Sequence, residues 1–156
     1  MVIDTCGLMM NITDFCKVIL KAPLKSVYDW SCETENAFFY LGWKGAADFK
    51  TGIVDVCSSD EQAIEKGASK QLLGKIERER NNLRDAVSAG KSIYYVLRVK
   101  QNPESDKNWG IVAKSKPMSN NTLILELADI KEHENGRITA TRIDQQEARR
   151  FRLNPK

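Results

Sequence analysis

The sequence contains a single histidine among its 156 residues, and this scarcity excludes several kinds of chemistry. Histidine is the usual base or proton relay in catalysis and a common ligand of zinc, so no histidine-dependent active site is expected. The one histidine, His133, stands in the polar stretch KEHENGR, where an exposed and uninvolved imidazole is the simplest interpretation. We therefore expect neither a metal site nor a cofactor.

Long apolar runs and paired cysteines are also missing. No apolar stretch approaches the roughly 18 residues that cross a bilayer, and the first residues lack the basic and apolar regions of a signal peptide. The four cysteines, at positions 6, 16, 32 and 57, form no C-x-x-C pair. The expectation is a cytoplasmic protein with reduced thiols and no membrane partner.

No glycine-rich loop follows a predicted strand, so a Walker or Rossmann nucleotide site has no support. With 42% hydrophobic and 29% charged residues, the composition is that of an ordinary globular protein, and the length fits one domain over residues 1–156. The net charge of +3 is too small to establish a nucleic-acid partner. It is unevenly distributed, because residues 1–57 carry −2 and residues 58–156 carry +5. A surface for a polyanion is expected in the second part.

The first third of the chain is predicted to be β-rich. Residues 15–22 alternate apolar side chains with lysine, which predicts a strand that ends before Pro23. Residues 37–43 and 51–57 are two further predicted strands. The stretch NAFFYLGWKG at 36–45 places large apolar groups in unbroken succession, so we expect it to be buried on both faces.

Residues 58–89 are predicted to form a long helix. Ser58 and Glu61 have the spacing of a capping box, and apolar residues recur every three to four positions. These apolar residues are Ile64, Ala68, Leu72, Ile76, Leu83 and Val87. Gly67 and Gly74 each weaken the middle by up to about 1 kcal/mol relative to alanine, so a kink or a break is possible at either position.

Four strand-like runs follow the helix. They cover 92–100, 109–114, 122–131 and 137–143. Short connections rich in Pro, Asn, Ser and Gly predict an antiparallel meander, and a short helix is expected over 145–152. The order of elements predicts an α+β fold, in which one long central helix and a short C-terminal helix pack on a curved antiparallel sheet or partial barrel of about six to eight strands.

One pattern resembles an enzyme site. Glu104 or Asp106 precedes a predicted strand that carries Glu126, Asp129 and Lys131, which loosely resembles the PD-(D/E)xK arrangement of Mg²⁺-dependent nucleases. The alternative is that these charges lie in a loop and at a strand end, where they only face water.

Arginine is favoured over lysine for two-pronged contacts with phosphate, and five of the nine arginines stand in the last twenty residues. The candidate nucleic-acid-binding residues are Arg78, Arg80, Arg84, Arg98, Arg142, Arg149, Arg150 and Arg152. The candidate stacking residues are Trp30, Trp43 and Trp109. The alternative is that the C-terminal charges merely solvate a helix and match its dipole.

Residues 80–97, RNNLRDAVSAGKSIYYVL, with the later WGIVAKS and TLILELADIKEHENGRITATRIDQQEARRF, resemble the second half of an EVE domain, a PUA-like family. In that family an Arg-Asn-x-Leu-Arg stretch leads to Gly-Asp, here Gly90-Lys91, and then to an aromatic-rich strand. The resemblance covers about half of the chain. It implies a small pseudo-barrel that binds nucleic acid, in related members by holding a modified base in an aromatic pocket.

Three functions are therefore predicted in order. The first is a small, non-catalytic module that binds DNA or RNA and stacks a base on tryptophan. The alternative is an accessory or inhibitor protein, of the phage or mobile-element type, that binds a host protein through the same arginines and aromatic residues. The third is the Mg²⁺-dependent nuclease.

Overall fold

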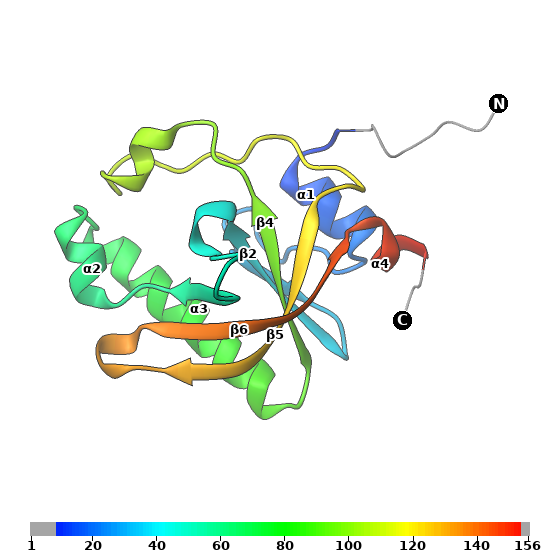
Figure 1. Cartoon of the computed structure of the whole chain (residues 1–156). Helices are drawn as coiled ribbons and strands as arrows, with labels where there is room; N and C mark the ends of the chain where they lie inside the picture. The colour runs from blue at the N-terminus through cyan, green and yellow to red at the C-terminus, as the bar shows by residue number, and fades with distance from the viewer. Residues whose placement is uncertain (1–8, 154–156) are drawn as a thin grey trace.

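In the computed structural model, which describes residues 9–153, six strands form one sheet that curls like half a barrel (Figure 1). The strands are β1 (Ser31–Glu33), β2 (Ala37–Trp43), β3 (Ile53–Cys57), β4 (Ser92–Arg98), β5 (Leu123–Glu132) and β6 (Ile138–Glu147). The helices are α1 (Ile12–Asp14), α2 (Asp60–Glu65), α3 (Lys70–Ser88) and α4 (Arg149–Leu153). Single turns are η2 (Phe15–Ile19), η3 (Lys44–Ala46), η4 (Pro103–Asp106) and η5 (Glu134–Gly136). The predicted α+β fold, with its curved sheet, long helix and short C-terminal helix, is confirmed.

The strand order across the sheet is β1-β2-β4-β5-β6-β3. Strands β4, β5 and β6 form the predicted antiparallel meander. Strands β2 and β4 are parallel, with Ala37 opposite Ser92 and Trp43 opposite Arg98, which the hairpin-like connections did not indicate. The parallel pair arises because β3, α2 and α3 form a crossover between the two strands, as parallel neighbours require.

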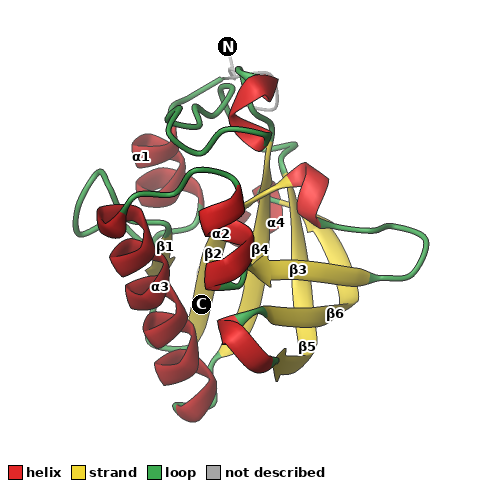
Figure 2. Ribbon diagram, turned by 90° about the vertical axis from the view of Figure 1, so that its left-hand side faces the viewer, coloured by secondary structure: helices red, strands yellow, loops and turns green. Residues whose placement is uncertain are grey.

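The sheet separates two hydrophobic cores, and β2 contributes to both. Phe38 packs on the face covered by α3, together with Leu83 of that helix. Phe39 packs on the opposite face, which α1, η2 and α4 cover, together with Phe15 (Figure 2). Because Phe38 and Phe39 are 0% and 1% exposed, the prediction that this strand is buried on both faces is confirmed.

The prediction of a strand at 15–22 is wrong, because the segment Phe15–Ile19 is helical. It continues α1 as the widened, π-type turn η2. Phe15, Cys16 and Ile19 are fully buried, whereas Val18 is exposed, which is the spacing of one helical face. The apparent alternation came from Lys17 and Lys21, which both point to solvent at the flanks of that face.

The helix predicted at 58–89 is broken at Gly67, whose φ of +89° ends α2. Gly74, by contrast, lies inside the continuous helix α3. The capping box is formed by Ser59 with Gln62, one position later than predicted. The buried face of α3 also carries two charged residues, Glu79 and Arg80, which its apolar periodicity did not indicate.

Two predicted elements that follow α3 in the sequence differ from the structure. Residues 109–114 form no strand, because the chain there follows the surface between β4 and β5, and Ile111 and Val112 are exposed. Strand β6 continues to Glu147, since its pairing with β5 resumes beyond a bulge and reaches Leu123. The C-terminal helix therefore starts at Arg149 rather than at residue 145.

Candidate functional site

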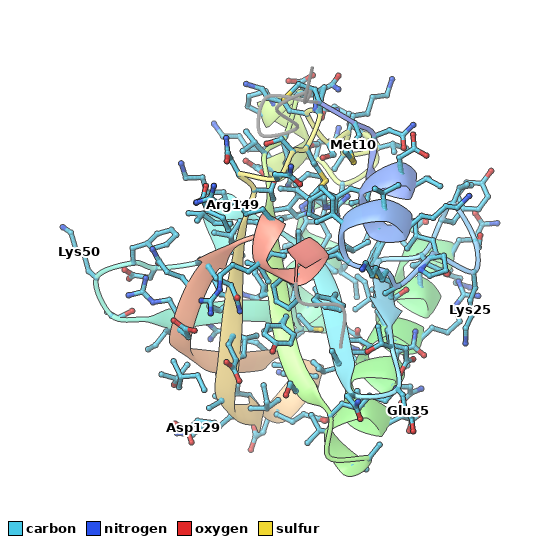
Figure 3. All side chains as sticks on the ribbon, turned by 90° about the vertical axis from the view of Figure 1, so that its right-hand side faces the viewer. Met10, Lys25, Glu35, Lys50, Asp129 and Arg149 are labelled. Atoms are coloured by element: carbon cyan, nitrogen blue, oxygen red, sulfur yellow. The ribbon has the colours of Figure 1, made fainter. Side chains whose placement is uncertain are left out.

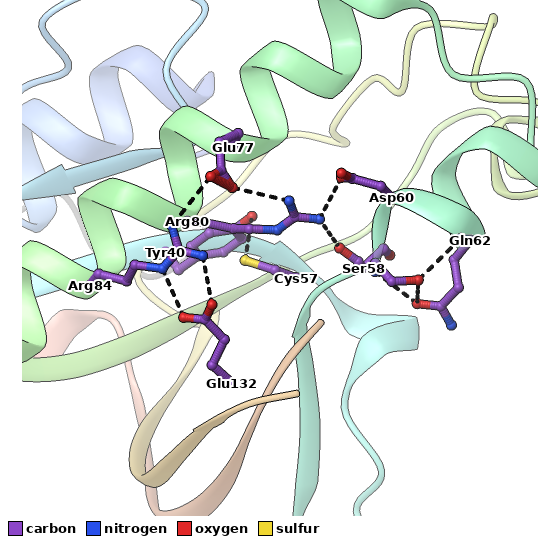
Figure 4. A network of polar contacts seen from close by, with 10 residues as sticks. Tyr40, Cys57, Ser58, Asp60, Gln62, Glu77, Arg80, Arg84 and Glu132 are labelled. Carbon is purple, nitrogen blue, oxygen red and sulfur yellow. Dashed lines mark hydrogen bonds and ion pairs between the residues drawn. The ribbon is translucent and has the colours of Figure 1, made fainter. Parts of the chain in front are cut away.

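Arg80, a predicted nucleic-acid contact, is inside the protein (Figure 4). It is 2% exposed, and its guanidinium donates to the Ser58 carbonyl at 2.6 Å and pairs with Asp60 at 3.0 Å and Glu77 at 3.1 Å. Gly136 of η5 lies against this group, and a Cβ there would approach the guanidinium carbon to 2.7 Å. Arg80 therefore connects α3 to α2 and to the β5–β6 hairpin instead of facing a ligand.

Arg84 makes a second internal contact one turn further along α3 (Figure 4). Its Nε and Nη2 donate to the two carboxylate oxygens of Glu132 at 2.8 and 2.7 Å. This two-pronged contact lowers the pKa of Glu132 and joins the end of β5 to α3. Arg84 is thus engaged by a carboxylate of its own chain.

The three tryptophans do not form one stacking pocket. Trp30 lies under Lys75 of α3, with the ammonium 5.3 Å from the ring centroid. Trp109 lies near the end of α2, with its backbone N–H donating to the Lys66 carbonyl and the Lys66 ammonium 5.5 Å from the ring. Each of these rings therefore already has a cation of the same chain over it, an arrangement typical of cation–π pairs.

Trp43 is the one tryptophan that meets a predicted arginine. It stands at the end of β2, opposite Arg98 of β4, and the guanidinium carbon lies 3.8 Å from the ring centroid. The Lys100 ammonium lies 5.1 Å from the same ring. Two predicted site residues from separate strands are thus brought together here.

The remaining predicted arginines lie nearer to solvent. Arg78 is exposed on α3, and Arg142 donates to Gln145 at 2.8 Å. Arg149 and Arg150 are exposed on α4, where Arg149 pairs with Glu147 at 3.3 Å. The side chain of Arg152 lies outside the described ones. Helices α3 and α4 cover opposite faces of the sheet, so the predicted arginines do not form one continuous surface.

Beside α4 lies a cavity of about 380 Å³ that sequence reasoning missed; we call it the aromatic cavity. Its walls are Leu20, Lys21, Thr34, Asn36, Ala37, Phe39, Ser92, Tyr94 and Phe151. The rings of Phe39 and Tyr94 are stacked 5.2 Å apart, and Phe151 meets both edge-on. These residues come from four separate stretches of the sequence, so no local motif indicates the cavity.

The border of the aromatic cavity carries polar groups that the protein itself does not use. The side chains of Lys21 and Asn36 form no hydrogen bond or ion pair with any other residue from 9 to 153. Lys21 has φ +57°, a left-handed conformation that costs a non-glycine residue about 1–2 kcal/mol. Such local strain is often found at binding sites.

Helix α4, which supplies Phe151 to the cavity wall, also carries positive charge. Arg149 and Arg150 directly precede Phe151, and Figure 3 shows Arg149 at the start of α4, with α1 and η2 on the other side of that helix. Helix α4 packs on η2, which carries the exposed Lys17. The cavity is therefore lined by three aromatic rings and one lysine, and the helix beside it is basic.

The predicted nuclease residues are not gathered. Asp106 pairs with Lys100 just beyond the end of β4, whereas Asp129 lies near the opposite end of the β4–β5 ladder. Glu126 lies between them, next to Tyr94. Among residues 9–153 no group of three His, Cys, Asp or Glu side chains is placed to hold a metal ion. The three cysteines within that range are free thiols, as predicted, and Cys6 lies outside it.

Comparison with known proteins gave no matching family model, no matching curated protein and no matching solved structure. None of the helices within the described part of the chain is long and apolar enough to cross a membrane.

Proposed function

We propose that the protein is a non-catalytic nucleic-acid-binding module that holds an unpaired base in the aromatic cavity. The observation that carries this proposal is the lining of the cavity, where the rings of Phe39, Tyr94 and Phe151 meet beside Lys21. The helix that supplies Phe151 also carries the exposed Arg149 and Arg150. Stacking of a base on an aromatic ring contributes about 1–3 kcal/mol, and adjacent cations contact the phosphates on either side of it.

The polar border supports a nucleotide rather than a purely apolar ligand. The amide of Asn36 offers both a donor and an acceptor for a base edge, and the Lys21 ammonium offers a charge for a phosphate. Bases in a duplex are already stacked and paired, so a single strand is the preferred form of this ligand. The resemblance of residues 80–97 to an EVE domain agrees with this function, and we propose a cytosolic location for the protein.

Replacing Arg149 and Arg150 with alanine is expected to weaken binding of single-stranded oligonucleotides of any sequence. The plot of log K against log salt has a negative slope. Each phosphate contact that is lost makes this slope less steep by about 0.7 for single strands. The melting temperature should stay nearly unchanged, since both side chains are exposed. Fluorescence anisotropy at two or more salt concentrations measures the slope.

The exposed Arg78→Ala variant is the matched control, because Arg78 lies on α3 across the sheet and should leave affinity unchanged. An equal loss with Arg78→Ala would mean that the binding surface is on α3. Absence of any binding by the wild-type protein at low salt would reject the function itself.

Replacing Phe151 with leucine is expected to reduce single-strand affinity by about 5- to 150-fold, which corresponds to the loss of one stacked base. The substitution keeps an apolar side chain, so the fold should persist. Phe49→Leu is the control, because Phe49 is an exposed ring on the loop before β3. Equal affinity of Phe151→Leu and wild type would exclude the aromatic cavity as the base site.

A protein partner is the second candidate, and one exposed surface favours it. Phe49, Ile53 and Ile143 are 40%, 49% and 59% exposed, and Phe49 and Ile53 line a cavity of about 860 Å³ beside β3. The loop is held in shape by Asp48, whose carboxylate accepts from the backbone N–H groups of Lys50 and Thr51. Rigid exposed aromatic and aliphatic groups of this kind are typical of protein contact sites.

A further inference from the structure

Arg98 is placed differently from the other arginines. Its side chain turns back over β2, where Nη2 donates to the Leu41 carbonyl at 2.7 Å and Nε to the Gly42 carbonyl at 3.2 Å. The guanidinium carbon lies over the Trp43 ring, 3.8 Å from its centroid. The contacts fix both the position and the plane of this group.

No carboxylate of residues 9–153 pairs with Arg98, whereas Arg80, Arg84, Arg137 and Arg149 all do. Burial lowers the pKa of Arg98 to about 10, although the group remains charged at neutral pH. A cation held largely out of water needs compensation, and neutral carbonyl groups supply only part of it. An anion bound from outside would supply the rest.

The unused part of the guanidinium is accessible. Nη1 makes no hydrogen bond to the described residues and is not a buried unsatisfied atom, so it keeps some contact with solvent. Lys100 brings a second cation to the same tryptophan ring. Its ion-pair partner is Asp106, whose side chain is 61% exposed.

We propose that Arg98 and Lys100 form a phosphate-binding site with Trp43 as its base. A guanidinium edge matches two phosphate oxygens, and an adjacent ammonium adds a point charge for a third. Two cations against the single exposed Asp106 leave an excess positive charge, which suits the double charge of a phosphate better than the single charge of a carboxylate. The site is separate from the aromatic cavity, so it stands whether or not that cavity binds a base.

Asp106 competes with the incoming phosphate for Lys100. Exposed ion pairs contribute about 0–1 kcal/mol, so this contact is easily exchanged. Removing the carboxylate of Asp106 should therefore increase phosphate affinity, while removing the guanidinium of Arg98 should decrease it. A purely structural role of Arg98 predicts no effect of Asp106 on phosphate binding.

The test uses the full chain with Trp30→Phe and Trp109→Phe, so that Trp43 is the only fluorescent tryptophan. Inorganic phosphate is titrated at constant ionic strength, with chloride in the reference titration. We expect a saturable change in Trp43 emission with phosphate, at least tenfold weaker in Arg98→Lys and severalfold tighter in Asp106→Asn. No saturable change, or identical affinities in Asp106→Asn and its parent, would overturn the proposal.

A second arm distinguishes the source of the phosphate. If a single-stranded oligonucleotide displaces inorganic phosphate from Trp43, the site contacts a nucleic-acid backbone; if only a mononucleotide or phosphate binds, the site takes a free phosphate ligand. Both results support the site. A third result is that oligonucleotides bind in a manner that depends on Phe151, while inorganic phosphate causes no change in Trp43 emission. That result would retain the proposed function and reject the phosphate site.

Discussion

Replacing Phe38 with alanine is expected to reduce the free energy of unfolding by about 3–5 kcal/mol. Phe38 is 0% exposed and packs between the sheet and α3, next to Leu83 and Ile93. The substitution loses both the transfer free energy of the ring and its packing contacts. Strand β2 is paired on both sides, with β1 and β4, so it cannot move in to fill the space. Urea denaturation followed by circular dichroism measures the loss.

Phe49→Ala is the control for this substitution, since it removes the same ring from an exposed position. It should change stability by no more than about 0.5 kcal/mol, as surface substitutions usually do. A near-neutral Phe38→Ala would show that β2 is not packed as described. Equal losses in both variants would indicate that the loop before β3 is part of the core.

Replacing Arg80 with alanine is expected to cost about 3 kcal/mol of stability, at the lower end for breaking a buried ion pair. The lower end applies because the carboxylates left behind, Asp60 and Glu77, are 53% and 50% exposed and regain water. The variant loses the hydrogen bond to the half-buried Ser58 carbonyl and the contact with Gly136, which both lie against the guanidinium. Thermal and chemical denaturation give the value.

Arg78→Ala is the matched control on the same helix, because Arg78 is exposed and should be neutral within about 0.5 kcal/mol. Arg80→Lys should recover only part of the stability, since an ammonium cannot reach the Ser58 carbonyl and two carboxylates in one plane. An Arg80→Ala protein of unchanged stability but weaker nucleic-acid affinity would reverse the assignment and make Arg80 a ligand contact.

Local patterns predicted the core of the fold well. Strands β2, β4 and β5 were found from their apolar runs, because burial imposes composition directly on the strand. The segment at 15–22 was misread, since a helical face and an alternating strand share several apolar positions over so few residues. The parallel pairing of β2 with β4 depends on the path of the whole crossover, which no local pattern contains.

The candidate site was predicted less well than the fold. Arg98 and Trp43 were both singled out, and the structure places them in contact. Composition could not reveal that Arg80 and Arg84 pair with carboxylates of their own chain, because arginine serves such ion pairs and phosphate contacts alike. The aromatic cavity was missed for a related reason, as Tyr94 and Phe151 are brought together only by the tertiary fold.

The strand order has a consequence for how the chain acquires its structure. Strand β3 precedes α3 in sequence, yet it pairs with β6, the final strand. The parallel neighbours β2 and β4 meet only after the crossover between them has formed. Early hairpins therefore cannot complete the sheet, and such sequence-distant pairings slow folding. During synthesis the edge of β3 stays unpaired until β6, the last strand, has been made. Until then its free backbone groups can pair with a wrong strand.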